Sequence, residues 1–115
     1  MRASLITISA LLLSASLLSF PVLSSETELT PERQNQLTHL LKQDCGSCHG
    51  MTLKGGLGPA LLPENLEGKP TLFLQNTILA GRPGTAMPPW KGILTEQEAL
   101  WLTKQLQQGI KDDQK

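Results

Sequence analysis

Two cysteines and a histidine stand together in the run Cys45-Gly46-Ser47-Cys48-His49. The C-x-x-C-H pattern is the signature of covalent haem attachment. Two residues between the cysteines allow both sulfur atoms to reach the vinyl groups on one edge of a porphyrin, and His49 then lies under the ring, where its Nε2 can bind the iron. The run therefore predicts one covalently bound haem c, with Cys45 and Cys48 as attachment points and His49 as an axial iron ligand.

Two other kinds of site use the same residue types. A thiol-disulfide redox pair needs a βαβ setting around its C-x-x-C, and the flanking sequence does not supply one. A structural zinc site needs four ligands, but the chain has only two cysteines, and His49 is adjacent to Cys48 and poorly placed to share a tetrahedral ion with it. Haem attachment is therefore the interpretation that we carry forward.

A second axial ligand must approach the opposite face of the haem. Met51 is only two residues beyond His49, and at roughly 3.3 to 3.6 Å per residue its tether is too short to pass around the ring. Met87 has a longer tether and stands in the run Ala86-Met87-Pro88-Pro89-Trp90, where prolines restrict the backbone. His/Met coordination is common in electron-transfer cytochromes. We therefore expect Met87 to bind the iron; an ordinary core or surface methionine is the alternative, and the competing His39 is expected to face solvent.

A histidine that binds a metal donates its other ring N–H to a fixed acceptor. Pro59 follows Gly58 in the loop after the haem motif. Its carbonyl oxygen is the acceptor that we expect for Nδ1 of His49, and a plain turn proline is the alternative.

Helices must position these residues. The first is expected to open at Thr30-Pro31-Glu32, where an N-cap hydroxyl precedes a proline and an acid, and to run into Cys45. The second is expected to begin at Lys69-Pro70-Thr71 and to end at Gly81, which is placed as a C′ residue.

The last helix is predicted by a capping box, Thr95-Glu96-Gln97-Glu98, and should end before Gly109. Residues 50–67 and 81–92 are rich in glycine and proline, which predicts loops, the first with room for a turn or two of helix. The inner face of the last helix is expected to hold Ala99, Leu102 and Leu106. No segment alternates with the period of a strand, so the predicted fold class is all-α.

Residues 1–24 have the features of a secretory signal peptide. A short basic start precedes a mostly apolar stretch from Leu5 to Leu18, and Val22-Leu23-Ser24 offers small or branched residues before a cleavage point. We therefore expect export to the periplasm, with residues 25–115 as the monohaem domain and no membrane span after cleavage. The alternative is an uncleaved anchor over Ala3–Leu23, which reaches the roughly 20 residues of a spanning helix but is interrupted by serines.

The charge of the chain is balanced. It has 10 basic and 10 acidic side chains, and removal of Arg2 with the signal leaves 9 against 10, a formal charge of −1. This balance gives no reason to expect a nucleic acid partner or long-range electrostatic steering. The length indicates one domain, expected to be a monomer, and a buried cofactor would help to stabilise so small a core.

The mature chain resembles class I c-type cytochromes along its whole length, with a helix ending in the Cys45–His49 run, a Gly58-Pro59 step, a Met87-Pro88 loop and a C-terminal helix. This resemblance implies about three to five helices wrapped around one covalently bound haem. In that family the first and last helices cross near the haem edge, and Trp101 resembles the aromatic residue of that crossing. The run from Ile78 to Trp90 is similar to that of the small NirC-type cytochromes associated with dissimilatory nitrite reductase in denitrifying bacteria.

The resemblance implies an electron carrier, not an enzyme. It would transfer single electrons between redox proteins, among which nitrite reductase is the partner that the narrower NirC resemblance implies, or take part in maturing the d-type haem of that reductase. The alternative is a haem-based sensor or an accessory factor in haem d maturation, in which the Met87 ligand is labile. A small peroxidase ranks last, because no distal histidine and arginine pair stands at an obvious spacing.

Overall fold

The computed structural model describes residues 28–110. The predicted signal peptide, residues 1–24, lies outside the described residues. The helical elements are α1 (Pro31–Leu40), a π-helix η1 (Leu41–Cys45), α2 (Gly46–His49), α3 (Pro63–Leu66), α4 (Thr71–Ala80) and α5 (Glu96–Gln108). Residues 28–110 contain no strand, and the all-α prediction is confirmed. Within that range, none of the helices combines the length and the apolar composition that crossing a bilayer requires.

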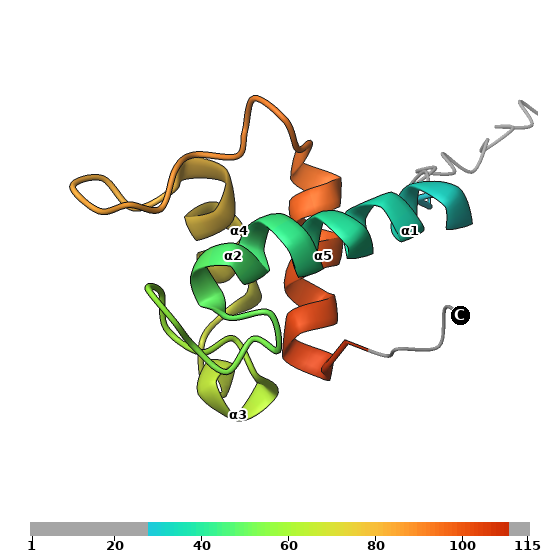
Figure 1. The fold of residues 1–115 in the computed structure, drawn as a ribbon. Coiled ribbons are helices and arrows are strands. Elements are labelled where there is room, and N and C mark those ends of the chain that lie inside the picture. The colour runs from blue at the N-terminus through green and yellow to red at the C-terminus, as the bar shows by residue number, and fades with distance from the viewer. Residues whose placement is uncertain (1–27, 111–115) are drawn as a thin grey trace, which may run out of the picture.

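The first three elements form one continuous rod that crosses α5 (Figure 1). Helix α4 packs along α5, and α3 contacts α5 as well. The rod and α5 are joined by an ion pair in which Nε of Arg33 lies 2.6 Å from Oε1 of Glu98. The helices at the two ends of the described chain, α1 and α5, are therefore joined directly, and they support the loops between them.

The core is built almost entirely from leucine. Leu37 and Leu41 of the rod meet Leu102 and Leu106 of α5, and the loops and α3 close the cluster with Leu53, Leu66 and Leu94. A leucine that is fully buried stabilises the fold by roughly 1.5 to 3 kcal/mol. Trp101 is half-buried and packs against this cluster, so the aromatic residue singled out by the sequence lies at the edge of the core.

The predicted helix ends agree with the structure. Thr30 caps α1, where its Oγ1 accepts a hydrogen bond from the backbone N–H of Arg33 at 3.2 Å. The capping box of α5 is complete: Glu98 N–H donates to Oγ1 of Thr95 at 3.2 Å, and Thr95 N–H donates to Oε2 of Glu98 at 2.8 Å. Helix α4 is followed by Gly81 and α5 by Gly109. These termini follow from local chemistry, because the hydroxyl and carboxylate groups accept from nearby backbone N–H groups, and the two glycines adopt the positive φ with which α4 and α5 end.

The rod contains one feature that the sequence analysis did not anticipate. Its chain stays helical into Cys45, but Leu41–Cys45 is a π-helix, a wider turn that is rare and often lies at functional sites. As a result the buried positions advance by four residues from Leu37 to Leu41 and then by five to Gly46. Gly46 therefore faces the core.

Candidate haem-binding site

The C-x-x-C-H run lies where the rod ends. Cys45 closes the π-helix, and Cys48 and His49 belong to the short helix α2. Both cysteines are free thiols and are half-buried. Gly46 takes the buried position, while Cys45 packs against the edge of the leucine cluster and both cysteines keep part of their surface exposed.

The two thiols do not have the same surroundings. The pKa of Cys45 is raised to about 11, mainly by burial of the thiol and in part by the nearby carboxylate of Asp44. A thiol that is protonated at neutral pH is a weak nucleophile and a weak ligand for a free metal ion. Among residues 28–110, no three histidine, cysteine or carboxylate side chains gather as a metal site would need.

The loop after α2 folds back against its end and holds the histidine. Gly55 N–H donates to the carbonyl oxygen of His49 and Gly58 N–H to that of Cys48, both at 2.8 Å. The carbonyl oxygen of Pro59 lies 2.7 Å from Nδ1 of His49. With the proton on Nδ1 in this hydrogen bond, the lone pair of Nε2 is available to a metal.

Gly58 stands directly against the imidazole. A Cβ added there would lie 2.8 Å from both Cε1 and Nδ1 of His49. Real Cβ atoms do not approach other atoms so closely, so any side chain at this position would push the ring away. The Gly58-Pro59 step therefore supplies both the space for the ring and the acceptor that orients it.

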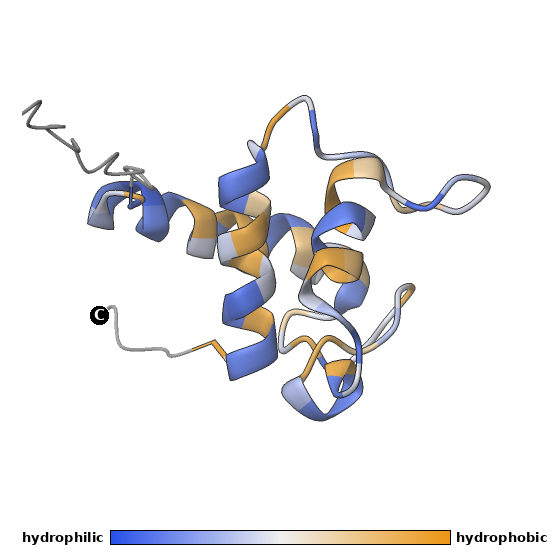
Figure 2. Ribbon diagram, turned by 180° about the vertical axis from the view of Figure 1, so that it is seen from behind, coloured by the Kyte–Doolittle hydropathy of each residue, from blue (hydrophilic) through white to orange (hydrophobic). Residues whose placement is uncertain are grey.

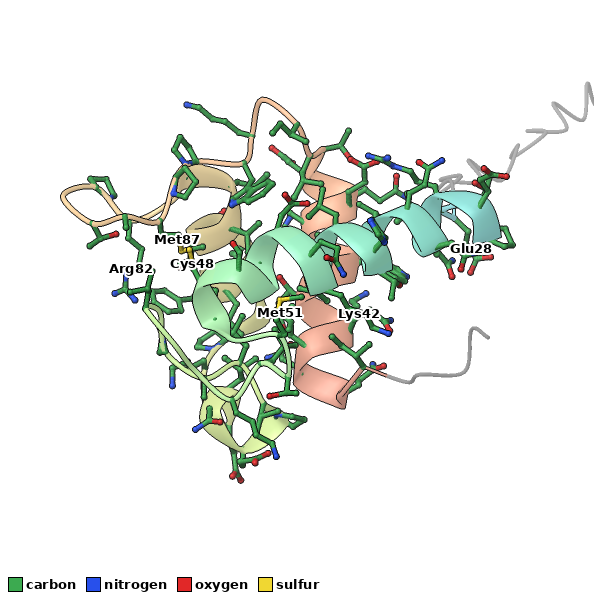
Figure 3. The ribbon with its side chains drawn as sticks, viewed as in Figure 1. Glu28, Lys42, Cys48, Met51, Arg82 and Met87 are labelled. Carbon is green, nitrogen blue, oxygen red and sulfur yellow. The ribbon has the colours of Figure 1, made fainter. Side chains whose placement is uncertain are left out.

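Met87 lies in the loop between α4 and α5 and is half-buried. Its backbone N–H donates to Oγ1 of Thr85 at 3.3 Å, and its carbonyl oxygen accepts from Arg82 N–H at 3.2 Å. In the view of Figure 3, Met87 and Cys48 project together between α2 and α4, whereas Met51 lies over α5. Met51 is 59% exposed, and His39 is exposed on α1.

The loop of Met87 is also fixed to the end of α4. Trp90 N–H donates to the carbonyl oxygen of Ile78 at 3.2 Å, and Lys91 N–H donates to that of Leu79 at 3.1 Å. These carbonyls belong to the last turn of a helix, where they have no partner within the helix itself. The proline-rich segment is therefore a fixed structure, although it contains no regular element.

Helix α4 has an apolar surface that the protein leaves uncovered. Six of its ten residues are apolar (Leu72, Phe73, Leu74, Ile78, Leu79 and Ala80), yet none of the ten is buried. Leu72 is 64% exposed and Phe73 is 50% exposed, and α4 shows as largely hydrophobic in Figure 2. A small protein rarely exposes such a face unless something binds there. Leu74, Ile78 and Leu79 are half-buried and pack against the leucine core, so the exposed part of this surface belongs to Leu72, Phe73 and Ala80.

These features together fit a haem c. Two free thiols stand at the C-x-x-C-H spacing, the adjacent imidazole has one nitrogen already hydrogen-bonded, and an apolar helix face lacks a cover. A flat apolar macrocycle attached at Cys45 and Cys48 would bury such a face and would present its iron to Nε2 of His49.

Comparisons with known proteins point the same way. Residues 32–104 match the family model described as cytochrome C oxidase, cbb3-type, subunit III. The chain is 62% identical over 77 residues to cytochrome c55X of Pseudomonas aeruginosa, an alignment that covers 67% of this chain and 65% of that protein. This chain therefore spans somewhat less than two thirds of that relative.

Two solved structures are similar as well. A c-type cytochrome NirC superposes with a TM-score of 0.70 at 57% identity, covering 71% of this chain and 96% of that one. A dihydro-heme d1 dehydrogenase NirN in complex with DHE superposes with a TM-score of 0.57 at 38% identity, covering 61% of this chain and 15% of that one. The similarity to NirN is thus to a small part of a much larger protein.

Proposed function

This chain belongs to the c-type cytochromes, as a small cytochrome of the NirC type that binds haem c covalently, and from this premise we propose that it carries single electrons between redox proteins in the periplasm. The haem supplies an iron that gains or loses one electron at a time. The observation that carries the proposal is the fixed proximal side: Nδ1 of His49 is held 2.7 Å from the Pro59 carbonyl oxygen. A ligand that does not move between oxidation states suits a site that only passes electrons.

In this proposal His49 and Met87 would both hold the iron, which would leave no coordination site for a substrate. A thioether sulfur and the apolar surface of α4 both favour the reduced iron, because neither stabilises additional positive charge. We therefore expect a positive reduction potential.

The proposed route for the electron is the haem edge attached to Cys45 and Cys48. Both cysteines are half-buried, and Ser47 between them is exposed. A partner can therefore approach this edge without any rearrangement of the core. A formal charge of −1 over residues 25–115 provides little long-range attraction, so docking depends on local contacts around the edge.

We propose dissimilatory nitrite reductase as the electron acceptor, because a similar solved structure is a NirC cytochrome. The test is to mix the reduced protein with purified nitrite reductase and nitrite and to follow haem oxidation by stopped-flow absorbance. Oxidation that speeds up with reductase concentration and supports nitrite consumption is the expected result. Oxidation at the same slow rate with and without the reductase would refute this partner.

A second candidate is an accessory role in maturation of the d-type haem of that reductase, favoured by the similarity to part of a dihydro-heme d1 dehydrogenase. A deletion strain separates the two functions. If the protein supplies electrons, the reductase made in this strain should contain its full d-type haem, but in the cells it should receive electrons slowly. If the protein serves maturation, the reductase should lack that haem or hold an incomplete form of it.

A labile distal ligand would favour a sensor or a maturation factor over a carrier. The reduced protein, unaltered, is exposed to carbon monoxide while its optical spectrum is recorded. An unchanged spectrum is expected for a carrier with Met87 bound, and a shifted one would move the assignment to the alternatives.

N-terminal sequencing of the protein from the periplasmic fraction tests export and cleavage after residue 24, since an anchored form would remain with the membranes.

A further inference from the structure

Gly81 has a backbone conformation that other residues do not adopt. It follows the last residue of α4 with φ +66° and ψ −166°, a region of backbone space that is essentially reserved for glycine. It is also buried, while the five residues after it are exposed. The chain therefore turns at a buried point directly before the loop that contains Met87.

The reason for the burial is a close approach of backbone to backbone. A Cβ added at Gly81 would lie 2.6 Å from the carbonyl carbon of Pro88 and 2.7 Å from the carbonyl oxygen of Met87. It would also lie 2.7 Å from the backbone nitrogen of Pro89. All three atoms belong to the main chain, so they cannot rotate aside as the end of a flexible side chain can.

The same stretch of backbone has little freedom to retreat. The carbonyl oxygen of Met87 accepts the Arg82 N–H, and the Trp90 N–H is bonded to the carbonyl oxygen of Ile78. Pro88 and Pro89 fix two successive φ angles between these anchors. The close contact with Gly81 and these hydrogen bonds together fix where the Met87 peptide lies.

We propose that Gly81 is a positioning residue for the Met87 ligand. Because Gly81 has no side chain, the Met87–Pro88 backbone can lie directly against the end of α4, and this contact sets where that backbone lies. This inference rests on the proposed ligation of the iron by Met87. A side chain at position 81 displaces that backbone, carries the thioether with it and weakens its bond to the iron. Glycine at this position therefore controls how firmly the distal ligand is held.

The test compares Gly81→Ala with Gly84→Ala in the haem-loaded protein. Gly84 also has a positive φ, +79°, but nothing lies within 4 Å of a Cβ added there. Both variants therefore carry backbone strain, and only Gly81→Ala creates the contact. The measurements are the methionine-to-iron charge-transfer band of the oxidised protein and carbon monoxide binding to the reduced protein.

Gly81→Ala is expected to lose much of the charge-transfer band and to bind carbon monoxide, with an affinity for the thioether reduced by about ten- to a hundredfold, as for other residues that support a metal ligand. Gly84→Ala is expected to keep the charge-transfer band and not to bind carbon monoxide. Equal spectra for the two variants would overturn the proposal. A Gly81→Ala protein that fails to fold, judged by helical circular dichroism, would also overturn it, because the role of Gly81 would then be structural.

Two further variants separate this inference from the ligand assignment. If Met87→Ala keeps the charge-transfer band, Met87 is not the ligand and the proposed coordination fails first. If Met87→Ala loses the band while Gly81→Ala keeps it, only the positioning role fails. In the double variant, addition of Gly81→Ala to Met87→Ala should change carbon monoxide affinity no further, since the two changes act through one bond.

Discussion

Nδ1 of His49 lies 2.7 Å from the carbonyl oxygen of Pro59, a backbone acceptor ten residues further along the chain. This hydrogen bond fixes the plane of the imidazole and leaves Nε2 as the nitrogen available to the iron in the proposed coordination. It also makes the ring a stronger electron donor, which stabilises the oxidised metal relative to the reduced one. Because the acceptor belongs to the backbone, replacing the Pro59 side chain alone does not remove it.

The hydrogen bond can instead be disturbed through its neighbour. Gly58→Ala would place a Cβ 2.8 Å from Nδ1, which pushes the ring away from the Pro59 carbonyl. We expect a higher reduction potential, because the oxidised iron loses donation from the histidine. A spectroscopic redox titration measures it. Gly92→Ala is the control, since nothing lies within 4 Å of its added Cβ; equal potentials in the two variants would contradict the prediction.

Met87 and Met51 make a matched pair for testing the distal ligand. Met87→Ala should open the iron to carbon monoxide and abolish the methionine-to-iron charge-transfer band. Met51→Ala should change neither, because Met51 is 59% exposed and lies too close to His49 in sequence to reach the opposite face. Optical spectra of both variants decide the matter, and a Met51→Ala protein that lost the band would reverse the assignment.

The raised pKa of Cys45 predicts slow alkylation before haem attachment. With a pKa of about 11, about one thiol in a hundred is ionised at pH 9, given a tenfold change per pH unit. The rate of reaction with iodoacetamide, followed by peptide mass spectrometry, should therefore rise steadily from pH 8 to about 11. Asp44→Asn should shift this curve to lower pH, and Gln43→Ala should not. A curve centred at the ordinary cysteine pKa would show that the haem-free chain does not hold Cys45 in this environment.

The ion pair between the first and last helices predicts a pH-dependent stability. The hydrogen bond from Arg33 is the largest cause that lowers the pKa of Glu98 in the folded chain. A lowered carboxyl pKa stabilises the fold above the ordinary value, and the contribution is lost as pH falls through the lowered one.

Glu98→Gln should therefore reduce the melting temperature of the holoprotein at neutral pH and have progressively less effect in acid. Thermal melts across this range provide the measurement. Arg33→Gln should give the same profile, because it removes the other half of the pair. A difference between Glu98→Gln and the original protein that stays constant with pH would exclude the ion pair as its cause.

The features that could be predicted from the sequence are those set by neighbouring residues. Thr95 and Glu98 form their capping box, and Gly81 ends its helix, because each acts on backbone only a few residues away. The C-x-x-C-H run is local in the same sense, and the similar c-type cytochromes support covalent haem c. The roles of His49, Met87 and Pro59 toward the iron stay predictions.

The features that could not be predicted depend on distant parts of the chain or on the cofactor. The exposure of Leu72 and Phe73 on α4 depends on which parts of the helix the rest of the chain covers, and spacing in the sequence does not reveal this. The approach of Gly81 to Pro88 depends on how the loop returns to α4, which spacing does not reveal. The π-helix likewise arises where the rod must satisfy both the leucine core and the haem motif.

That wide turn acts as a single-residue insertion in the rod. One residue advances an α-helix by about 100°, so if the same residues continued beyond Leu41 as a regular α-helix, the position four residues after Leu41 would face the leucines. That position is Cys45, the first cysteine of the haem motif. Its sulfur would be enclosed by the protein and withheld from the porphyrin. The extra residue in the π-helix thus shifts the helix by one position, so that Gly46 and not Cys45 takes the buried position.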